Sequence, residues 1–231
     1  MKTSNKLLLV SASSLIVIML VLLLVLRIAL EPSTDIEDSA KSEGAQLTKQ
    51  FTVEDFTAIQ VIGHWEVDVV HGDTTQVIAE APESFMDTIV VEKHIQTLIL
   101  ENKRRFGEAR AWIRLPSLVD LRLKGLISLK LRGFDTDSLS MRTSGATTIN
   151  GTGNKIRDLS VSAEGVTNLD LRENPVTNAD LRCEGVYKVE LSMAGGELSG
   201  KVKGVGEVTY NGKVTKEGIL RSGHSKVTHQ D

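Results

Sequence analysis

The sequence predicts an all-β protein in which stacked β-coils form a solenoid behind one N-terminal transmembrane helix. Three observations lead to this prediction. A run of twenty residues near the N-terminus carries no charge. After residue 50, apolar and polar residues alternate through much of the chain. From residue 125 onward, glycines recur at intervals of 19 or 20 residues.

The uncharged run extends from Leu7 to Leu26 and predicts a membrane anchor. As a helix, twenty residues span about 30 Å, which is the thickness of the hydrocarbon core of a bilayer. The apolar character resumes after Arg27 and ends at Leu30, so we place the anchor at residues 7–30, with the lipid bilayer as its partner. The run is too long for a cleavable signal peptide, and no A-x-A-like site or lipobox cysteine follows it. An uncleaved signal anchor is therefore favoured over a cleaved signal.

The flanking charges predict the orientation of this anchor. Lys2 and Lys6 precede it, whereas Arg27 is the one nearby cation at its far end. Because the side richer in Lys and Arg is normally cytoplasmic, we expect residues 1–6 in the cytoplasm and the body of the chain outside it.

Residues 31–50 are polar and acidic, which predicts a flexible linker, and the patterned body occupies residues 51–231. Between Phe56 and Glu101, apolar and polar residues alternate around a turn at Gly72-Asp73. Period-two alternation with turn residues predicts strands. No segment after residue 50 has a convincing helical period.

A column of glycines defines the repeat. Glycine adopts positive φ without steric cost, so each of these glycines is interpreted as the corner of a coil between two short strands. A fixed short period is typical of a solenoid. The glycines are Gly125, Gly145, Gly165, Gly185, Gly204 and Gly223. A leucine-rich repeat is the less favoured alternative, because the asparagine that its signature requires is found once, at Asn174.

Alignment on the glycines brings apolar residues into further columns, at four and two residues before the glycine and at one and four residues after it. Leu121, Leu129 and Leu169 belong to these columns. A single repeat cannot bury its own apolar residues, so the coils are expected to stack about 4.8 Å apart. The single cysteine, Cys183, falls in such a column, which favours a small buried residue over a reactive thiol.

The last repeat loses the apolar pattern. Its apolar positions hold Glu217, Arg221, His224 and His229, which we interpret as a polar cap that prevents end-to-end sheet growth. Metal binding by His224 and His229 is the less favoured alternative, because no other His or Cys column supports it.

Composition and motifs argue against several classes of function. The formal net charge of −3 gives no support to a nucleic-acid partner. The sequence contains no Walker A loop, dinucleotide fingerprint, H-E-x-x-H motif or G-x-S-x-G elbow. We therefore expect no catalytic residues, no cofactor and no metal. Stacked acids such as Asp170 and Glu190 leave a polysaccharide-acting β-helix enzyme as an alternative.

A column of cations stands three residues before the glycines, at Arg122, Arg142, Arg182 and Lys201. Stacked cations repel one another unless something compensates them. One interpretation is a face that binds an anionic ligand, such as envelope polysaccharide or a lipid headgroup. The other, which is favoured, is a solvated face compensated by Glu164 and Glu184.

Three segments resemble the GIN domain, which is described as the head domain of autotransporter adhesins in bacterial envelopes. They are Ser144-Gly145-Ala146-Thr147-Thr148-Ile149, the segment from Gly204 to Gly212, and Phe56-x-x-Ile59-x-Val61-x-Gly63. The resemblance covers residues 51–231. It implies a single-stranded, right-handed parallel β-helix, a bacterial source and an exported location, and it supplies no catalytic residues.

Anchor, repeat and resemblance together predict a non-catalytic binding or adhesion module of the bacterial cell envelope. We expect it in the inner membrane, with its body periplasmic or extracellular. Its expected partner is envelope polysaccharide or another envelope protein. A polysaccharide-acting enzyme and a structural or regulatory envelope subunit are the alternatives.

Overall fold

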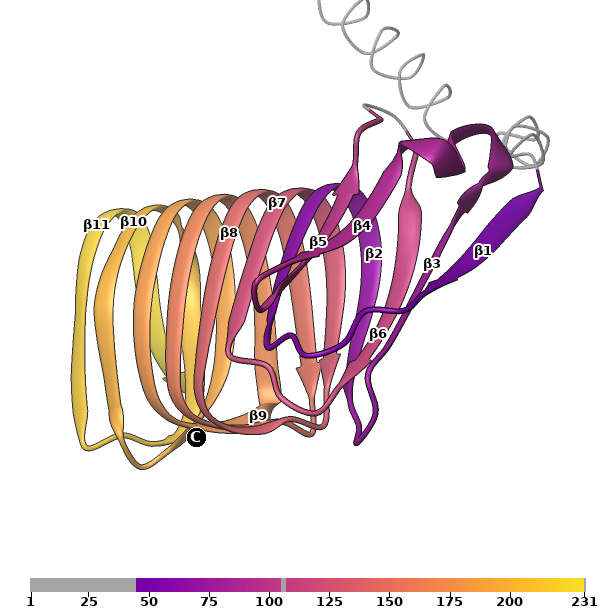
Figure 1. The fold of residues 1–231 in the computed structure, drawn as a ribbon. Coiled ribbons are helices and arrows are strands. Elements are labelled where there is room, and N and C mark those ends of the chain that lie inside the picture. Colours follow the sequence, from indigo (N-terminus) through magenta and orange to yellow (C-terminus); the bar gives the residue numbers. More distant parts are fainter. Residues whose placement is uncertain (1–44, 105–106, 231) are drawn as a thin grey trace, which may run out of the picture. The chain divides into compact units, whose positions relative to one another are not determined.

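The computed structural model describes residues 45–104 and 107–230, and this part of the chain is an all-β solenoid (Figure 1). Its strands are β1 (Gln46–Phe51), β2 (Ala58–His71), β3 (Gln76–Pro82), β4 (Ile89–His94), β5 (Thr97–Asn102), β6 (Ala109–Leu115), β7 (Asp120–Arg132), β8 (Asp135–Thr152), β9 (Lys155–Ala194), β10 (Glu197–Lys213) and β11 (Lys216–Gln230). One short 3-10 helix, η2 (Glu83–Thr88), lies between β3 and β4. The solenoid prediction is confirmed.

The described residues include no helix that is long and apolar enough to cross a bilayer. The predicted anchor at residues 7–30 and the tail at residues 1–6 lie outside this part of the chain.

The coils are parallel and in register, following the strand order β2-β7-β8-β9-β10-β11. Gly125 pairs with Gly145, and Gly185 pairs with Gly204. The register also includes a coil that the glycine spacing did not predict, because Gly63 of β2 pairs with Gly125 of β7. Residues 72–119, which lie between these two strands, interrupt the sequence period but not the stack. We name each coil by its corner glycine.

Two constraints explain the glycine column. Gly125 has a φ of +132° and Gly204 a φ of +123°, a region that side chains rarely tolerate. A Cβ at Gly204 would also lie 2.0 Å from the carbonyl oxygen of Gly185 on the coil before. The corners therefore need glycine both for their backbone conformation and for the close approach of neighbouring coils, as the sequence predicts for corner residues.

Even offsets from the glycine point into the core and odd offsets point outward. Leu121, Leu129 and Leu169 are fully buried, and Cys183 is buried in the column two residues before the glycine. The column two residues after the glycine is also buried, although Thr147 and Thr167 belong to it. These hydroxyls are hydrogen-bonded 3.3 Å apart, which satisfies them in the core.

The column one residue after the glycine, apolar in sequence, lies outside the core. Leu126 and Val205 are 54% and 56% exposed. Their odd offset explains this placement, because residues at odd offsets point out of the core.

Asparagine forms a buried ladder that the sequence pattern does not predict. Asn154 and Asn174 are fully buried, and the Asn154 side-chain amide donates to Asn174 Oδ1 at 2.7 Å. Asn174 Nδ2 donates to the carbonyl of Gly151 at 2.8 Å. The asparagine position is thus filled in two successive coils, at Asn154 and Asn174. These coils belong to a β-solenoid and not to a leucine-rich repeat.

Antiparallel pairs cover the N-terminal end of the solenoid. β1 pairs with β3, β3 with β6, and β4 with β5. β1 begins at Gln46, so residues 46–50 of the predicted linker belong to the folded body. Their side chains are exposed, and the strand is held by its backbone pairing with β3, so burial left no pattern in the sequence.

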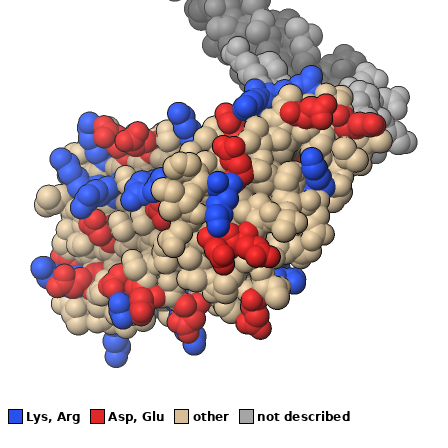
Figure 2. All heavy atoms as spheres, in the orientation of Figure 1, with Lys and Arg blue, Asp and Glu red and all other residues tan. Residues whose placement is uncertain are grey.

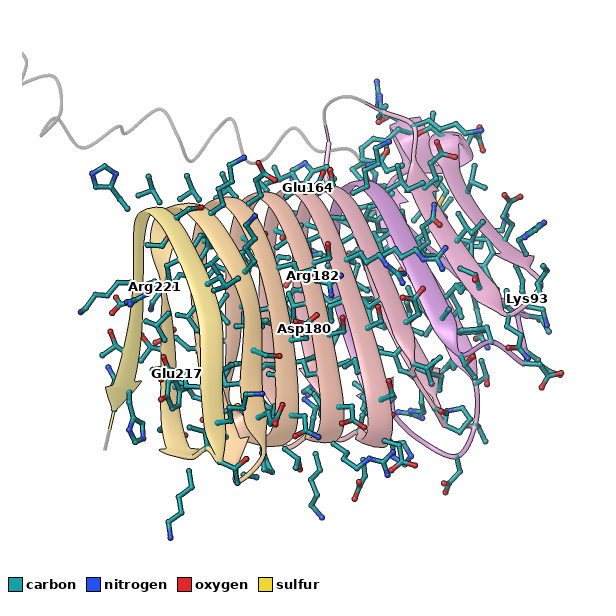
Figure 3. The ribbon with its side chains drawn as sticks, turned by 90° about the vertical axis from the view of Figure 1, so that its left-hand side faces the viewer. Lys93, Glu164, Asp180, Arg182, Glu217 and Arg221 are labelled. Carbon is teal, nitrogen blue, oxygen red and sulfur yellow. The ribbon has the colours of Figure 1, made fainter. Side chains whose placement is uncertain are left out.

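Polar groups close the C-terminal end, as predicted. Glu217 accepts a hydrogen bond of 2.6 Å from the buried Tyr210 hydroxyl. This bond, together with burial, raises the pKa of Tyr210 to about 12. The His229 ring stacks on the Tyr210 ring with centroids 4.8 Å apart. Glu217 and Arg221 both lie on the last coil (Figure 3).

Candidate functional site

The structure brings the predicted cationic column together on one face. Arg122 pairs in register with Arg142, and Arg182 with Lys201. The side chains of Arg122, Arg142 and Arg182 are 49%, 54% and 73% exposed. Because strand neighbours lie about 4.8 Å apart, the column presents cations at that repeat wherever it is filled.

The carboxylates that compensate this column come from a different place than the sequence suggested. Asp120 lies 2.7 Å from both Arg122 and Arg142, and Asp180 lies 3.0 Å from Arg182. Figure 3 shows Asp180 and Arg182 on this face. Both aspartates stand five residues before a corner glycine, where they point the same way as the cations.

The two predicted compensating residues are not paired with this column. Glu184 instead accepts from Lys203 at 2.6 Å, and that bond lowers the pKa of the Glu184 carboxyl. Within the described residues, neither Glu164 nor Lys201 has an oppositely charged group at salt-bridge distance.

A shallow depression of about 320 Å³ lies on the same face. Besides the buried Thr143, its charged and hydroxyl-bearing lining consists of Arg122, Lys124, Arg142, Ser144, Ser162 and Glu164. With Asp120 included, three positive charges face two negative ones. The depression can therefore hold an anionic group with hydroxyl donors around it.

The stacked acids of the alternative enzyme hypothesis are held by cations. Asp170 accepts two hydrogen bonds from the Arg172 guanidinium, at 3.0 and 2.6 Å, and one from the Arg172 backbone amide at 3.1 Å. These bonds keep the pKa of Asp170 below its ordinary value. Glu190 lies 2.8 Å from Lys188 and 3.7 Å from Arg172. The Asp170 carboxyl therefore lacks the environment that would keep it protonated as a general acid at neutral pH.

The remaining reactive side chains have structural surroundings. Burial raises the pKa of the Cys183 thiol to about 11, so little thiolate forms near neutral pH. His229 Nε2 lies 2.8 Å from the carbonyl oxygen of Gly212. In the part of the chain that the structure describes, no group of three metal-ligating side chains comes together.

A second surface follows from the exposed apolar column. We call Leu126, Ala146, Val166, Val186 and Val205 the apolar ridge. A groove of about 400 Å³ runs beside it, with Thr148, Asn168 and Lys188 on the other side. The sequence predicts this column but not its outward direction, although the odd offset from the glycine is a signal for it.

Charge is mixed over the body as a whole. In the view of Figure 2, cationic and anionic side chains are interspersed over the visible face of the described residues. The cationic column and the apolar ridge are therefore local features on a nearly balanced surface.

The family comparison decides the relationship of the chain to known proteins. A family model described as "Putative auto-transporter adhesin, head GIN domain" matches residues 55–214. The chain belongs to this family. The GIN match begins just before β2 and ends just after β10, so it includes both the cationic column and the apolar ridge.

Solved structures share the GIN fold of this chain at low sequence identity. A putative adhesin from Bacteroides fragilis has a TM-score of 0.65 and 16% identity, over 80% of this chain and 97% of its own. A putative lipid binding protein from Parabacteroides distasonis has a TM-score of 0.52 and 13% identity, over 81% of this chain and 98% of its own. A comparison with curated proteins gives no match. At these identities, the similarity shows the fold alone.

Proposed function

We propose that this GIN protein is a non-catalytic binding module of the bacterial cell envelope and that its cationic column binds an acidic envelope polysaccharide. The observation that carries the proposal is the sharing of one carboxylate, Asp120, by two arginines, Arg122 and Arg142. The pair therefore keeps a net positive charge on an exposed face.

The chemistry of this face suits a polymer. Its cations recur at the spacing of the coils, except in the coil of Gly165, where Ser162 takes the place of a cation. Ser144 and Ser162 add hydroxyl groups to the depression. Guanidinium groups bind carboxylates through paired, charge-assisted hydrogen bonds. A chain of uronic acids offers carboxylates and hydroxyls along its length, so it can contact several coils at once. Such binding adds contacts over successive coils and needs no deep pocket.

The alternative, a polysaccharide-acting enzyme, has less support. Among the described residues, every carboxyl group with a resolved pKa shift is shifted downward, as at Asp158 and Asp170. A general acid for glycosidic bond cleavage needs the opposite shift. The charge pairs on the solenoid therefore favour binding over bond cleavage.

Membrane attachment and export form part of the proposal. They rest on the uncharged run within residues 7–30 and on Lys2 and Lys6 before it. An alkaline phosphatase fused after residue 231 should be active, because this enzyme requires export. An inactive phosphatase fusion, together with a fluorescent cytoplasmic reporter at the same position, would contradict the proposed orientation.

The binding proposal is tested with the full chain in membrane vesicles, oriented with its body outward. Vesicles with the protein should retain a labelled polyuronate, and a neutral glucan of similar length should not be retained. Retention should fall as salt is added, because screening weakens contacts between exposed charges. Equal retention of both polymers, or retention of neither, would contradict the proposal.

A further inference from the structure

The apolar ridge has the character of a contact surface. Of the large hydrophobic side chains exposed in the described residues, Leu126, Val166, Val186 and Val205 form one column, and each is between 52% and 56% exposed. Ala146 completes the column. Five coils at about 4.8 Å give a stripe about 19 Å long. Contiguous exposed apolar surface of this kind marks interaction sites on soluble domains.

Two charged columns flank the ridge. One residue before the corner glycines stand Lys124, Ser144, Glu164, Glu184 and Lys203. Three residues after them stand Ser128, Thr148, Asn168, Lys188 and Glu207. Each flank has as many cations as anions, so neither selects a strongly charged partner. The two flanks differ in the order in which their charged residues follow one another along the coils.

We propose that the apolar ridge is the contact between two copies of this chain, which lie side by side and parallel, with a two-fold axis along the solenoid. This axis places each ridge residue against the same residue of the second copy. It also places the flank before the glycines against the flank after the glycines, coil by coil.

The order of charges supports this arrangement. In the coil of Gly185, Glu184 meets Lys188 of the second copy. In the coil of Gly204, Lys203 meets Glu207 of the second copy. The other coils bring together Lys124 with Ser128, Ser144 with Thr148 and Glu164 with Asn168, and no coil opposes two like charges. Opposite charges across an interface fix its orientation.

The antiparallel arrangement of the same two ridges fails this criterion. It would place Lys124 opposite Lys203 of the second copy and Glu164 opposite its own counterpart. Like charges in direct opposition disfavour an interface. The parallel arrangement is therefore the one that the flanking side chains fit.

The side chains that would form the new ion pairs are available for it. Glu184, Lys188 and Lys203 have side chains that are 64%, 59% and 60% exposed. Each also has an intrachain partner: Glu184 and Lys203 pair with each other, and Lys188 pairs with Glu190. Exposed pairs of this kind are weak, so the side chains can share a second partner.

The groove beside the ridge completes the fit. It lies between the ridge and Thr148, Asn168 and Lys188, so the two-fold axis brings the flank before the glycines of one copy over the groove of the other. A stripe about 19 Å long and one side chain wide is nevertheless smaller in area than the interfaces of stable free dimers. The dimer should therefore be weak in dilute solution and should form where the anchor proposed above confines both chains to one membrane. That anchor would also hold both chains in the same direction.

Single cysteines in the full chain, in its native membranes, test this arrangement. The natural Cys183 is buried, with a pKa raised to about 11, so it should not react. Val166→Cys, Leu126→Cys and Val205→Cys should each give most of the chain as a disulfide dimer after mild oxidation. Thr152→Cys, exposed away from the ridge, should stay monomeric.

The pattern of crosslinks decides the outcome. Dimers at all three ridge positions support the parallel arrangement. Dimers at Val166→Cys alone would show an antiparallel contact and overturn the proposal, as would the absence of dimers at every ridge position. Glu184→Lys should reduce the Val166→Cys dimer severalfold, and adding Lys188→Glu should restore it. Alkaline extraction of the same membranes reports separately on whether the chain is anchored.

Discussion

The ring of Tyr187 lies against Gly206, its register partner on the next coil. A Cβ at Gly206 would meet Tyr187 Cδ2 at 2.7 Å and the Tyr187 carbonyl oxygen at 2.1 Å. Gly206 does not have a positive φ, so packing alone requires glycine there.

Gly206→Ala should therefore lower the free energy of unfolding by about 1–3 kcal/mol, the usual cost of overpacking. Gly218→Ala is the matched control, because Gly218 has ordinary φ and nothing within 4 Å of an added Cβ. It should leave stability unchanged or raise it by up to about 1 kcal/mol. Denaturant melts of both variants measure the difference. Equal losses would show that the coil spacing at Gly206 is not as described.

The two tyrosines predict opposite effects of removing a hydroxyl group. The Tyr187 hydroxyl is buried without a hydrogen-bond partner among the described residues, whereas Tyr210 donates to Glu217 at 2.6 Å. Tyr187→Phe should leave the free energy of unfolding unchanged or raise it by about 1 kcal/mol. Tyr210→Phe should lower it by about 1–2 kcal/mol. The same sign for both substitutions in denaturant melts would contradict this assignment.

Gly63, Gly125 and Leu126 show how much of this fold can be predicted from the sequence. The strict glycine spacing predicted the corners from Gly125 onward because close coil contacts and positive φ allow no other residue. Gly63 was not recognised as part of the repeat, because residues 72–119, which form the N-terminal cap, separate its strand from that of Gly125. Leu126 belongs to an apolar column, but apolar character alone does not show whether a column faces the core or the solvent.

Buried polar residues are also difficult to predict from the sequence. Thr143 and Thr167 are buried because their hydroxyls are bonded to each other at 3.0 Å, a contact between coils that no local pattern encodes. For the cationic column, the sequence predicted which residues stand together. The prediction of the compensating acids was wrong, because Glu184 pairs with Lys203, whereas Asp120 forms ion pairs with both Arg122 and Arg142.

A carboxylate introduced at adjacent positions tests the register of the columns. Leu169 is fully buried and Asn168 is exposed. Leu169→Asp places an unpaired charge in the core and should lower the free energy of unfolding by several kcal/mol. Asn168→Asp should change it by no more than about 0.5 kcal/mol. If thermal melts gave similar losses for both variants, the stacked-coil register would be wrong.

The turn between β4 and β5 stores strain at Ile95. This side chain is 79% exposed, and its φ is +57°, a conformation that β-branched residues disfavour. Ile95→Gly should therefore raise the free energy of unfolding by about 1 kcal/mol. Val119→Gly, at an exposed apolar residue whose φ is not positive, should not stabilise the protein. A destabilised Ile95→Gly variant would mean that the side chain makes contacts that outweigh the strain.

Binding of an acidic polysaccharide by the Arg122–Arg142 pair is measured most directly by comparing the affinities of charge-matched variants. The double variant Arg122→Ala/Arg142→Ala should bind a polyuronate at least about tenfold more weakly, because a lost charge-assisted hydrogen bond costs on the order of 1.5–3 kcal/mol. Arg132→Ala/Arg157→Ala removes the same charge from exposed positions outside the cationic column and should bind like the natural chain. Melting temperatures confirm that each variant is folded. Equal weakening in the two double variants, or none in the first, would contradict binding at the cationic column.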